Sequence, residues 1–141
     1  MARNVSTVMI ATPANRVWAV LTEPEFIKQW QYGSLLTTDW NVGNGIRFKT
    51  EWQGQVFEQW GTVLEFSPCQ RLRYSLFAPR PGLEDRPENY FEMEYVLTEQ
   101  AGGTLLEIVQ VDNRDGAVQE DSQDESSNPI LAALKSIAES S

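Results

Sequence analysis

Hydrophobic and polar residues alternate along most of the chain, which is the pattern of strands that bury one face and expose the other. The alternation is cleanest over residues 46–53, where Ile46, Phe48, Thr50 and Trp52 share one face. Gly, Asn and Pro residues separate the alternating segments. The sequence therefore predicts a curved antiparallel sheet of about six to seven strands, drawn from residues 3–10, 35–40, 46–53, 56–66, 71–77, 90–98 and 104–111.

Two of these segments carry hydrophobic and polar side chains on both faces. For residues 3–10 this mixture predicts a strand near an edge of the sheet or a strongly bent one. For residues 56–66 it predicts a bulge near Gly61 and leaves open which face points inward. The direction of that segment decides whether Glu58 and Trp60 belong to the interior.

Two short helices are predicted after the first strand, over residues 12–30. Thr12 is expected to cap the first helix and Pro13 to start it, because its missing amide has no partner there. Thr22 and Pro24 end this helix and begin the next. Apolar residues at three- and four-residue spacing give both helices a stripe that faces a core: Ala14, Val17, Trp18, Leu21, Phe26, Ile27 and Trp30.

The end of the chain changes composition twice. Residues 112–128 are acidic and serine-rich with little to bury, so we interpret them as a linker. Residues 129–139 begin with Pro129, and Leu131, Leu134 and Ile137 follow at helical spacing. The sequence therefore predicts a short amphipathic C-terminal helix.

The order of these elements defines an α+β fold. Six consecutive hairpin-linked strands form a twisted sheet whose apolar face needs a cover, and the last helix is available to lie along it. A curved sheet that grips one helix leaves a gap between the two. This gap is the predicted pocket.

Length and composition narrow the class of protein. At 141 residues the chain has the length of one domain, so we expect residues 1–141 to form a single unit.

Eleven Lys and Arg against 20 Asp and Glu give a formal charge of -9, which repels nucleic acid and anionic lipid. We expect a cytoplasmic protein without nucleic-acid or membrane partners, since the sequence has neither a bilayer-spanning apolar run nor the zones of a signal peptide. A single cysteine fits a reducing compartment.

The chain has no histidine. It therefore lacks the commonest general base near neutral pH and the commonest transition-metal ligand. This excludes histidine-dependent serine and cysteine nucleophile systems and argues against zinc. We predict no catalytic residues, no metal and no cofactor.

Several segments together resemble the START-like (SRPBCC) superfamily, and within it the branch named for the activator of a heat-shock chaperone ATPase. They are ATPANRVWAVLTEPEFIKQW at the helix pair, GTVLEFSPCQRLRYSL over residues 61–76 and AGGTLLEIVQV over residues 101–111. The resemblance covers about residues 5 to 111. It implies a single START-like domain with a helix-grip fold and a hydrophobic cavity between the sheet and the C-terminal helix. The intervening acidic linker and the shortness of the last helix depart from the family pattern.

Other candidate chemistry is weaker. Cys69 follows a proline in a turn, and no histidine is present to activate it, so we assign it a structural role. Glu92 and Glu94 share a strand face opposite Phe91, which favours a solvated face over paired acid–base work. Residues 111–122 fail as a calcium loop, because valine and serine stand where the first and twelfth positions need carboxylates.

Aromatic residues give the strongest functional signal, since apolar ligand sites use them. Glu58 is a candidate for orienting a ligand if its face points inward, and Gln110 is a candidate for fixing a ligand through its amide. Filling of the core is the competing interpretation for the aromatics. The predicted pocket residues are Phe26, Trp30, Phe48, Trp52, Glu58, Trp60, Tyr74, Phe91, Met93, Tyr95, Ile108, Gln110, Leu131 and Leu134.

Three functions follow as hypotheses. The first is non-enzymatic binding of a small hydrophobic or aromatic molecule by a monomer or homodimer. The second, implied by the resemblance, is a chaperone-associated interaction protein. The third is an enzyme of the cyclase, aromatase or hydrolase kind that uses the same cavity through Glu58 or Tyr74.

Overall fold

Seven antiparallel strands form one sheet in the order β1-β7-β6-β5-β4-β3-β2. The computed structural model describes residues 2–30, 35–79, 82, 84–112 and 129–140. The strands are β1 (Ala2–Ile10), β2 (Leu35–Thr38), β3 (Gly45–Trp52), β4 (Gln55–Ser67), β5 (Arg71–Leu76), β6 (Phe91–Gln100) and β7 (Gly103–Asp112). The predicted sheet is confirmed. β1 lies at one edge, as its mixed faces indicated.

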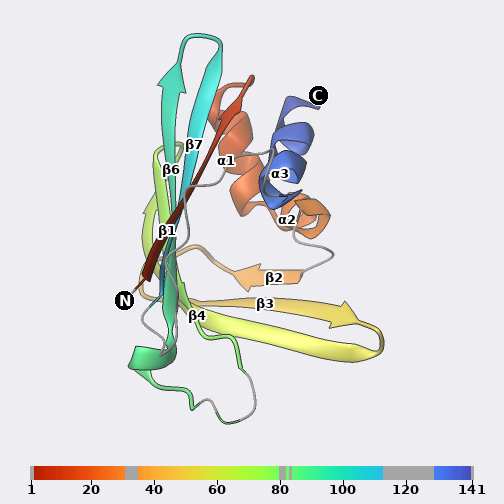
Figure 1. Cartoon of the computed structure of the whole chain (residues 1–141), viewed down its shortest axis with the longest axis vertical. Helices are drawn as coiled ribbons and strands as arrows, with labels where there is room; N and C mark the ends of the chain where they lie inside the picture. Colours follow the sequence, from red (N-terminus) through yellow and green to blue (C-terminus); the bar gives the residue numbers. More distant parts are fainter. Residues whose placement is uncertain (1, 31–34, 80–81, 83, 113–128, 141) are drawn as a thin grey trace.

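The sheet bends sharply along β4. Residues 55–62 of this 13-residue strand pair with β3, whereas the ladder with β5 begins at Val63 and shifts register between Val63 and Glu65. The irregularity thus lies just beyond Gly61, where the bulge was predicted. In Figure 1 the β3–β4 hairpin projects at a steep angle to β1, β7 and β6, so the sheet encloses a concave side.

The helices α1 (Ala14–Thr22), α2 (Pro24–Trp30) and α3 (Pro129–Glu139) lie together on this concave side (Figure 1). A 3-10 turn, η1 (Pro87–Asn89), precedes β6. The helix predicted over residues 129–139 is confirmed, and β7 includes Asp112, the first residue of the predicted linker. The rest of that linker, residues 113–128, lies outside the described residues.

The start of α1 differs from the prediction. Pro13 is the N-cap with extended backbone (ψ 156), the helix begins at Ala14, and no side chain caps it. Thr12 instead accepts a hydrogen bond of 2.9 Å at its carbonyl from the Thr104 hydroxyl, which is fully buried on β7. Since Pro13 occupies the N-cap position and no side chain caps the helix, the Thr12 cap predicted from the sequence was wrong.

Polar contacts fix the C-terminal end of α3 over β1 and beside α1. Glu139 accepts a hydrogen bond of 2.8 Å from the Ala11 amide, and the Lys135 ammonium donates one of 2.8 Å to the Met9 carbonyl. The Arg16 guanidinium donates to carbonyls of the last turn, at 3.2 Å to Ile137. Basic groups near a helix C-terminus satisfy carbonyls that have no intrahelical partner. The helix is therefore held by both backbone and side-chain partners from the first 16 residues.

Candidate functional site

Three aromatic rings from different strands meet on the concave face. Phe48 on β3, Tyr74 on β5 and Tyr95 on β6 are all buried. The Phe48 and Tyr74 ring centroids are 5.8 Å apart, and those of Tyr74 and Tyr95 are 5.9 Å apart. These spacings lie within the range of favourable aromatic contacts. The predicted convergence of these three residues is therefore present.

A hydrogen bond joins the two tyrosines inside this apolar surrounding. The Tyr74 and Tyr95 hydroxyl oxygens are 3.0 Å apart, and each residue is only 3% exposed. Burial raises the pKa of Tyr95 to about 12. Burial, and then the neighbouring Tyr95, raise the pKa of Tyr74 well above its ordinary value. Both phenols are neutral at physiological pH, since the low dielectric disfavours the phenolate.

The concave face continues from the tyrosines toward the end of β7. Tyr95 pairs with Ile108 and Met93 pairs with Gln110, so these side chains share the inward face. Met93, Ile108 and Gln110 are each partly exposed. Phe91 on the same face is buried. This end of the face is thus apolar with one amide, and it is less completely covered than the tyrosine pair.

Residues of the helices close the other side of this core. Trp30 of α2 and Leu131 and Leu134 of α3 are buried in the same hydrophobic cluster as Phe48, Phe91 and Tyr95. Phe26 is partly buried, and the Arg16 guanidinium lies 4.7 Å from its ring centroid. The C-terminal helix therefore packs its apolar stripe toward the concave face, as predicted.

Two predicted pocket residues lie on the opposite face. Phe48 pairs with Gln59 and Arg47 pairs with Trp60, so the Trp60 side chain shares the face of Arg47. The Arg47 guanidinium contacts the Trp60 ring at 5.4 Å and forms an ion pair with Glu58. The sequence left the direction of this segment open, and the strand register points Glu58 and Trp60 outward, so their inclusion among the pocket residues was wrong. Of Trp52 only the backbone belongs to the described residues.

Three aromatic residues outside the predicted pocket set extend the cluster. The Trp40 and Phe66 rings stack at 5.5 Å, and Trp18 meets Phe66 edge-on at 5.2 Å. Trp40 also reaches Tyr74, with centroids 6.4 Å apart. Trp40 follows β2 with a positive φ of 60, a conformation that the strand pattern did not indicate.

The outer face of the sheet carries the charged groups. Glu92 and Glu94 of β6 face Arg73 of β5, with N–O distances of 3.4 and 3.6 Å, and Arg71 also pairs with Glu94. Their predicted position on the face opposite Phe91 is confirmed. Exposed ion pairs of this kind contribute little stability each. Their functional consequence is that the cations of β5 and the anions of β6 point away from the tyrosine pair.

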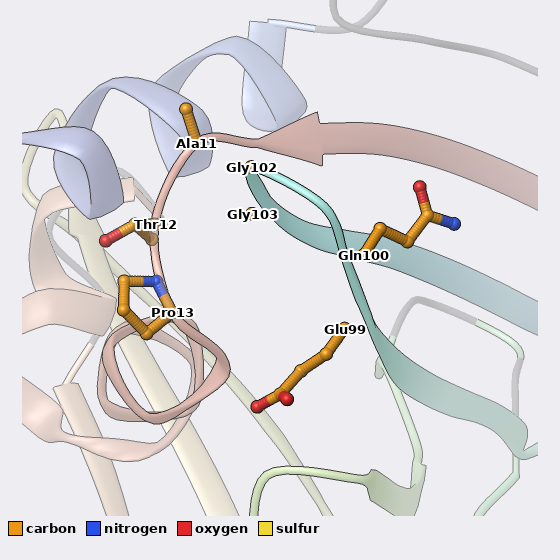
Figure 2. A pocket seen from close by; sticks show the side chains of 7 residues that line it. All are labelled: Ala11, Thr12, Pro13, Glu99, Gln100, Gly102 and Gly103. Carbon is orange, nitrogen blue, oxygen red and sulfur yellow. The ribbon is translucent and has the colours of Figure 1, made fainter.

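Surface hollows lie elsewhere on the molecule. One of about 350 Å³ lies between the turn at residues 11–13 and the β6–β7 hairpin; Glu99 extends toward that turn, whereas Gln100 points away from it (Figure 2). Another of about 410 Å³ is lined by residues 56–59 and by Ala78 and Pro79, so Glu58 borders this second hollow. Both are separate from the aromatic face.

The bent antiparallel sheet, the helix pair after β1 and the C-terminal helix define a helix-grip protein of the START-like kind. The sequence profile of the Activator of Hsp90 ATPase homolog 1-like protein family matches residues 11–139, and the chain belongs to this family. The resemblance inferred from the sequence is confirmed. No protein of curated function matches the chain in sequence.

Solved structures agree with this assignment. A solution structure from Cytophaga hutchinsonii is 34% identical, with a TM-score of 0.70 over 82% of this chain and 80% of that one. A Chromobacterium violaceum crystal structure is 20% identical, with a TM-score of 0.76 over 99% and 98%. The Aha1 dimer from Colwellia psychrerythraea is 13% identical, with a TM-score of 0.60 over 83% and 81%. The last two likenesses show the fold alone.

Within the described part of the chain, no helix has the length and apolar character needed to span a bilayer.

Proposed function

We propose that the protein binds a small hydrophobic or aromatic molecule, without catalysis, between the concave face of the sheet and α3. The observation that carries this proposal is the incomplete cover of an aromatic face: Met93, Ile108 and Gln110 point inward beside buried rings yet stay partly exposed. Ligand sites of this class are concave and mostly apolar, with few polar groups. A neutral amide and two neutral phenols meet that description.

An enzymatic role was predicted to use Glu58 or Tyr74, and only Tyr74 lies on the concave face. Glu58 lies on the outer face, where Arg47 pairs with it. Tyr74 stays on the concave face, but its raised pKa makes it a poor proton donor or acceptor near neutral pH. Binding without turnover is therefore the better supported proposal.

Tryptophan fluorescence tests the binding proposal. Trp18, Trp30 and Trp40 lie within or against the core cluster, so a ligand on the concave face is expected to change their emission. The wild-type protein is titrated with a fatty acid, a sterol and a flavonoid-like aromatic. A saturable change with at least one of them supports the proposal, and no change with any of them contradicts it.

Two variants of adjacent residues on β6 locate the site. Met93→Gln changes an inward side chain, whereas Glu92→Gln changes an outward one on the same strand. We expect Met93→Gln to weaken binding about tenfold, because it replaces apolar contact by an amide that must be desolvated. Glu92→Gln is expected to leave affinity unchanged. Equal effects of the two variants would place the ligand elsewhere.

The family description supports an alternative proposal, association with a chaperone ATPase. A family name is weak support, since one fold carries many functions. The test is the steady-state ATPase rate of an Hsp90-type chaperone with this protein in excess. An unchanged rate would count against the alternative without affecting the proposal of small-molecule binding.

A further inference from the structure

One edge of β4 is paired over only part of its length. β3 pairs with residues 55–62 on one side, whereas on the other side the ladder with β5 begins at Val63 and is followed by a bridge between Trp60 and Phe77. In that bridge the Trp60 amide donates to the Phe77 carbonyl at 3.3 Å, and the Phe77 amide donates to the Trp60 carbonyl at 2.7 Å. The backbone groups of Trp60 therefore point away from β3.

The same direction holds for Val56 and Glu58. Backbone groups of every second residue point to the same neighbouring strand in an antiparallel ladder, so Phe57 and Gln59 bond toward β3 while Val56 and Glu58 face the other side. Among the residues that the structure describes, none bonds to the backbone of Val56 or Glu58 on that side. Two N–H and two C=O groups thus form an open edge beside the end of β5.

A proline stops the chain from closing this edge with its own strand. The register of the Trp60–Phe77 bridge would set residue 79 opposite Glu58. Residue 79 is Pro79, which has no N–H to donate to the Glu58 carbonyl. Proline is for this reason rare inside a ladder. The open edge is therefore a consequence of the sequence at the end of β5.

The open edge borders a hollow and carries exposed apolar side chains. The hollow of about 410 Å³ is lined by residues 56–59 together with Ala78 and Pro79. Val56 and Phe57 are each 52% exposed. They lie on opposite faces of β4, because successive side chains of a strand alternate. A strand added at this edge would therefore cover one apolar side chain on each face of the sheet.

Charge restricts what such a strand can be. Among the described residues that line the hollow, Glu58 carries the only ionisable side chain, which is 35% exposed although Arg47 forms an ion pair with it. The whole chain has a formal charge of -9. Opposite charges on directly facing strand residues are favourable and like charges are not. A segment with Lys or Arg opposite Glu58 fits this edge, whereas an acidic segment does not.

We propose that residues 56–59 of β4 dock an extended, basic segment of another protein as an added antiparallel strand. Its backbone bonds to Val56 and Glu58, an apolar side chain covers Phe57, and a cation faces the Glu58 carboxylate. Main-chain bonds provide affinity in this mode of recognition and alternate side chains provide specificity. The docking edge is separate from the tyrosine pair, so this inference does not depend on small-molecule binding.

Three matched synthetic peptides test the proposal on the full chain. The basic probe has the order Thr, Lys, Phe, Val, Thr, Lys with blocked ends, and the acidic probe has Glu in place of both Lys. The third probe is the basic peptide N-methylated at its first Lys, which is designed to lie opposite Glu58. This peptide lacks the same N–H that Pro79 lacks and keeps every side chain.

Amide hydrogen exchange measured by NMR reports the backbone bonds directly. We expect the saturating basic peptide to slow exchange of the Val56 and Glu58 amides at least about tenfold, and to leave Phe57 and Gln59 little changed because β3 already holds them. The acidic peptide is expected to bind about fivefold more weakly. The N-methylated peptide is expected to give no protection.

Variants of two residues assign the effect to the edge. Val56→Pro removes an N–H from the open edge without removing a bond to β3, so it is expected to abolish the protection of Glu58. Val56→Ala is the matched control, which keeps the N–H and should retain that protection. Glu58→Gln is expected to reduce the preference for the basic over the acidic peptide to about twofold or less. If Val56→Pro does not fold, the N-methylated peptide makes the same test on the wild type.

Three results would overturn the proposal. One is unchanged exchange at Val56 and Glu58 with the basic peptide. Another is equal binding of the N-methylated peptide, which would mean that side chains alone hold it. The third is protection of both amides without peptide that increases with protein concentration, because a second copy of the chain would then occupy the edge. None of these results bears on the titrations with fatty acid, sterol and flavonoid-like aromatic.

Discussion

The indole N–H of Trp30 donates a hydrogen bond of 2.8 Å to the carbonyl oxygen of Val20, which ties α2 back to the end of α1. In a continuing helix this carbonyl would accept from residue 24, but Pro24 has no N–H. The Trp40 indole N–H bonds to the Thr22 carbonyl at 3.0 Å, because the helical donor of that carbonyl, the Phe26 amide, bonds to the Glu23 carbonyl at the turn instead. Two indole groups therefore supply donors that the sharp turn at Pro24 removes.

Replacing Trp30 by Phe should destabilise the protein. The change leaves the buried Val20 carbonyl without this donor and removes ring volume from a residue that is 4% exposed. We expect a loss of about 2 to 3 kcal/mol in the free energy of unfolding, measured by urea denaturation. Trp60→Phe is the matched control: the Trp60 indole N–H bonds to Asp85 at 3.0 Å in an exposed setting, and the loss there should be under about 1 kcal/mol. Equal losses would mean that the Trp30 bond contributes nothing specific.

Gly61 permits a close contact between two strands. A Cβ atom at this position would lie 1.8 Å from the Ser75 carbonyl oxygen, which is backbone and cannot rotate away. Gly61→Ala is therefore expected to lower the free energy of unfolding by about 3 kcal/mol or more, since β4 and β5 must separate. Gly45→Ala serves as the control on the neighbouring strand β3, because its Cβ would meet its nearest atom at 3.8 Å. Thermal denaturation of both variants measures the difference, and a tolerated Gly61→Ala would contradict the described β4–β5 contact.

Acid should weaken the attachment of α3 to β1. The hydrogen bond from the Ala11 amide, and then the one from Lys135, lower the pKa of the Glu139 carboxyl below its ordinary value of 4.5. Because the folded pKa lies below the unfolded one, this group adds stability above pH about 4.5 and loses it as the pH falls through the folded pKa. Glu139→Gln should thus be less stable than wild type at pH 7, by under about 1 kcal/mol since the carboxylate is largely exposed.

Urea denaturation between pH 3 and pH 7 measures this effect. The difference between wild type and Glu139→Gln is expected to shrink toward zero at the acid end. Glu51→Gln, at an exposed position on β3, is the control and should differ little from wild type at either end. A difference for Glu139→Gln that does not change with pH would show that its charge plays no part in holding the helix.

Elements whose signal is local were predictable from the sequence. The spacing of apolar residues in 14–30 and 129–139 predicted the three helices, and alternation of apolar and polar residues between turn residues predicted the seven strands. Proline at Pro24 and Pro129 marked helix starts for a reason that depends only on its own ring and missing N–H. The inward positions of Phe48, Tyr74 and Tyr95 followed from the same alternation.

The errors arose where distant residues decide the outcome. The Thr12 cap failed because α1 begins at Ala14 with Pro13 as its N-cap, while the Thr12 carbonyl accepts from the hydroxyl of Thr104, 92 positions away. The face of β4 depends on its register with β3, and both faces of that segment are mixed in sequence, so the outward direction of Glu58 and Trp60 was not encoded locally. The hydrogen bond between Tyr74 and Tyr95 also joins separate strands, and alternation alone places them on one face without showing that their hydroxyls meet.

The tyrosine pair itself gives the last test, as a double-mutant cycle. Either single change, Tyr74→Phe or Tyr95→Phe, leaves the other buried hydroxyl without its partner among the described residues, and each should cost about 1 to 3 kcal/mol in the free energy of unfolding. The double variant removes both hydroxyls, so it should cost less than the sum of the two single changes by about 1 kcal/mol. Urea denaturation of the four proteins at pH 7 gives the coupling. Additive costs would mean that the two hydroxyls, although 3.0 Å apart, do not stabilise one another.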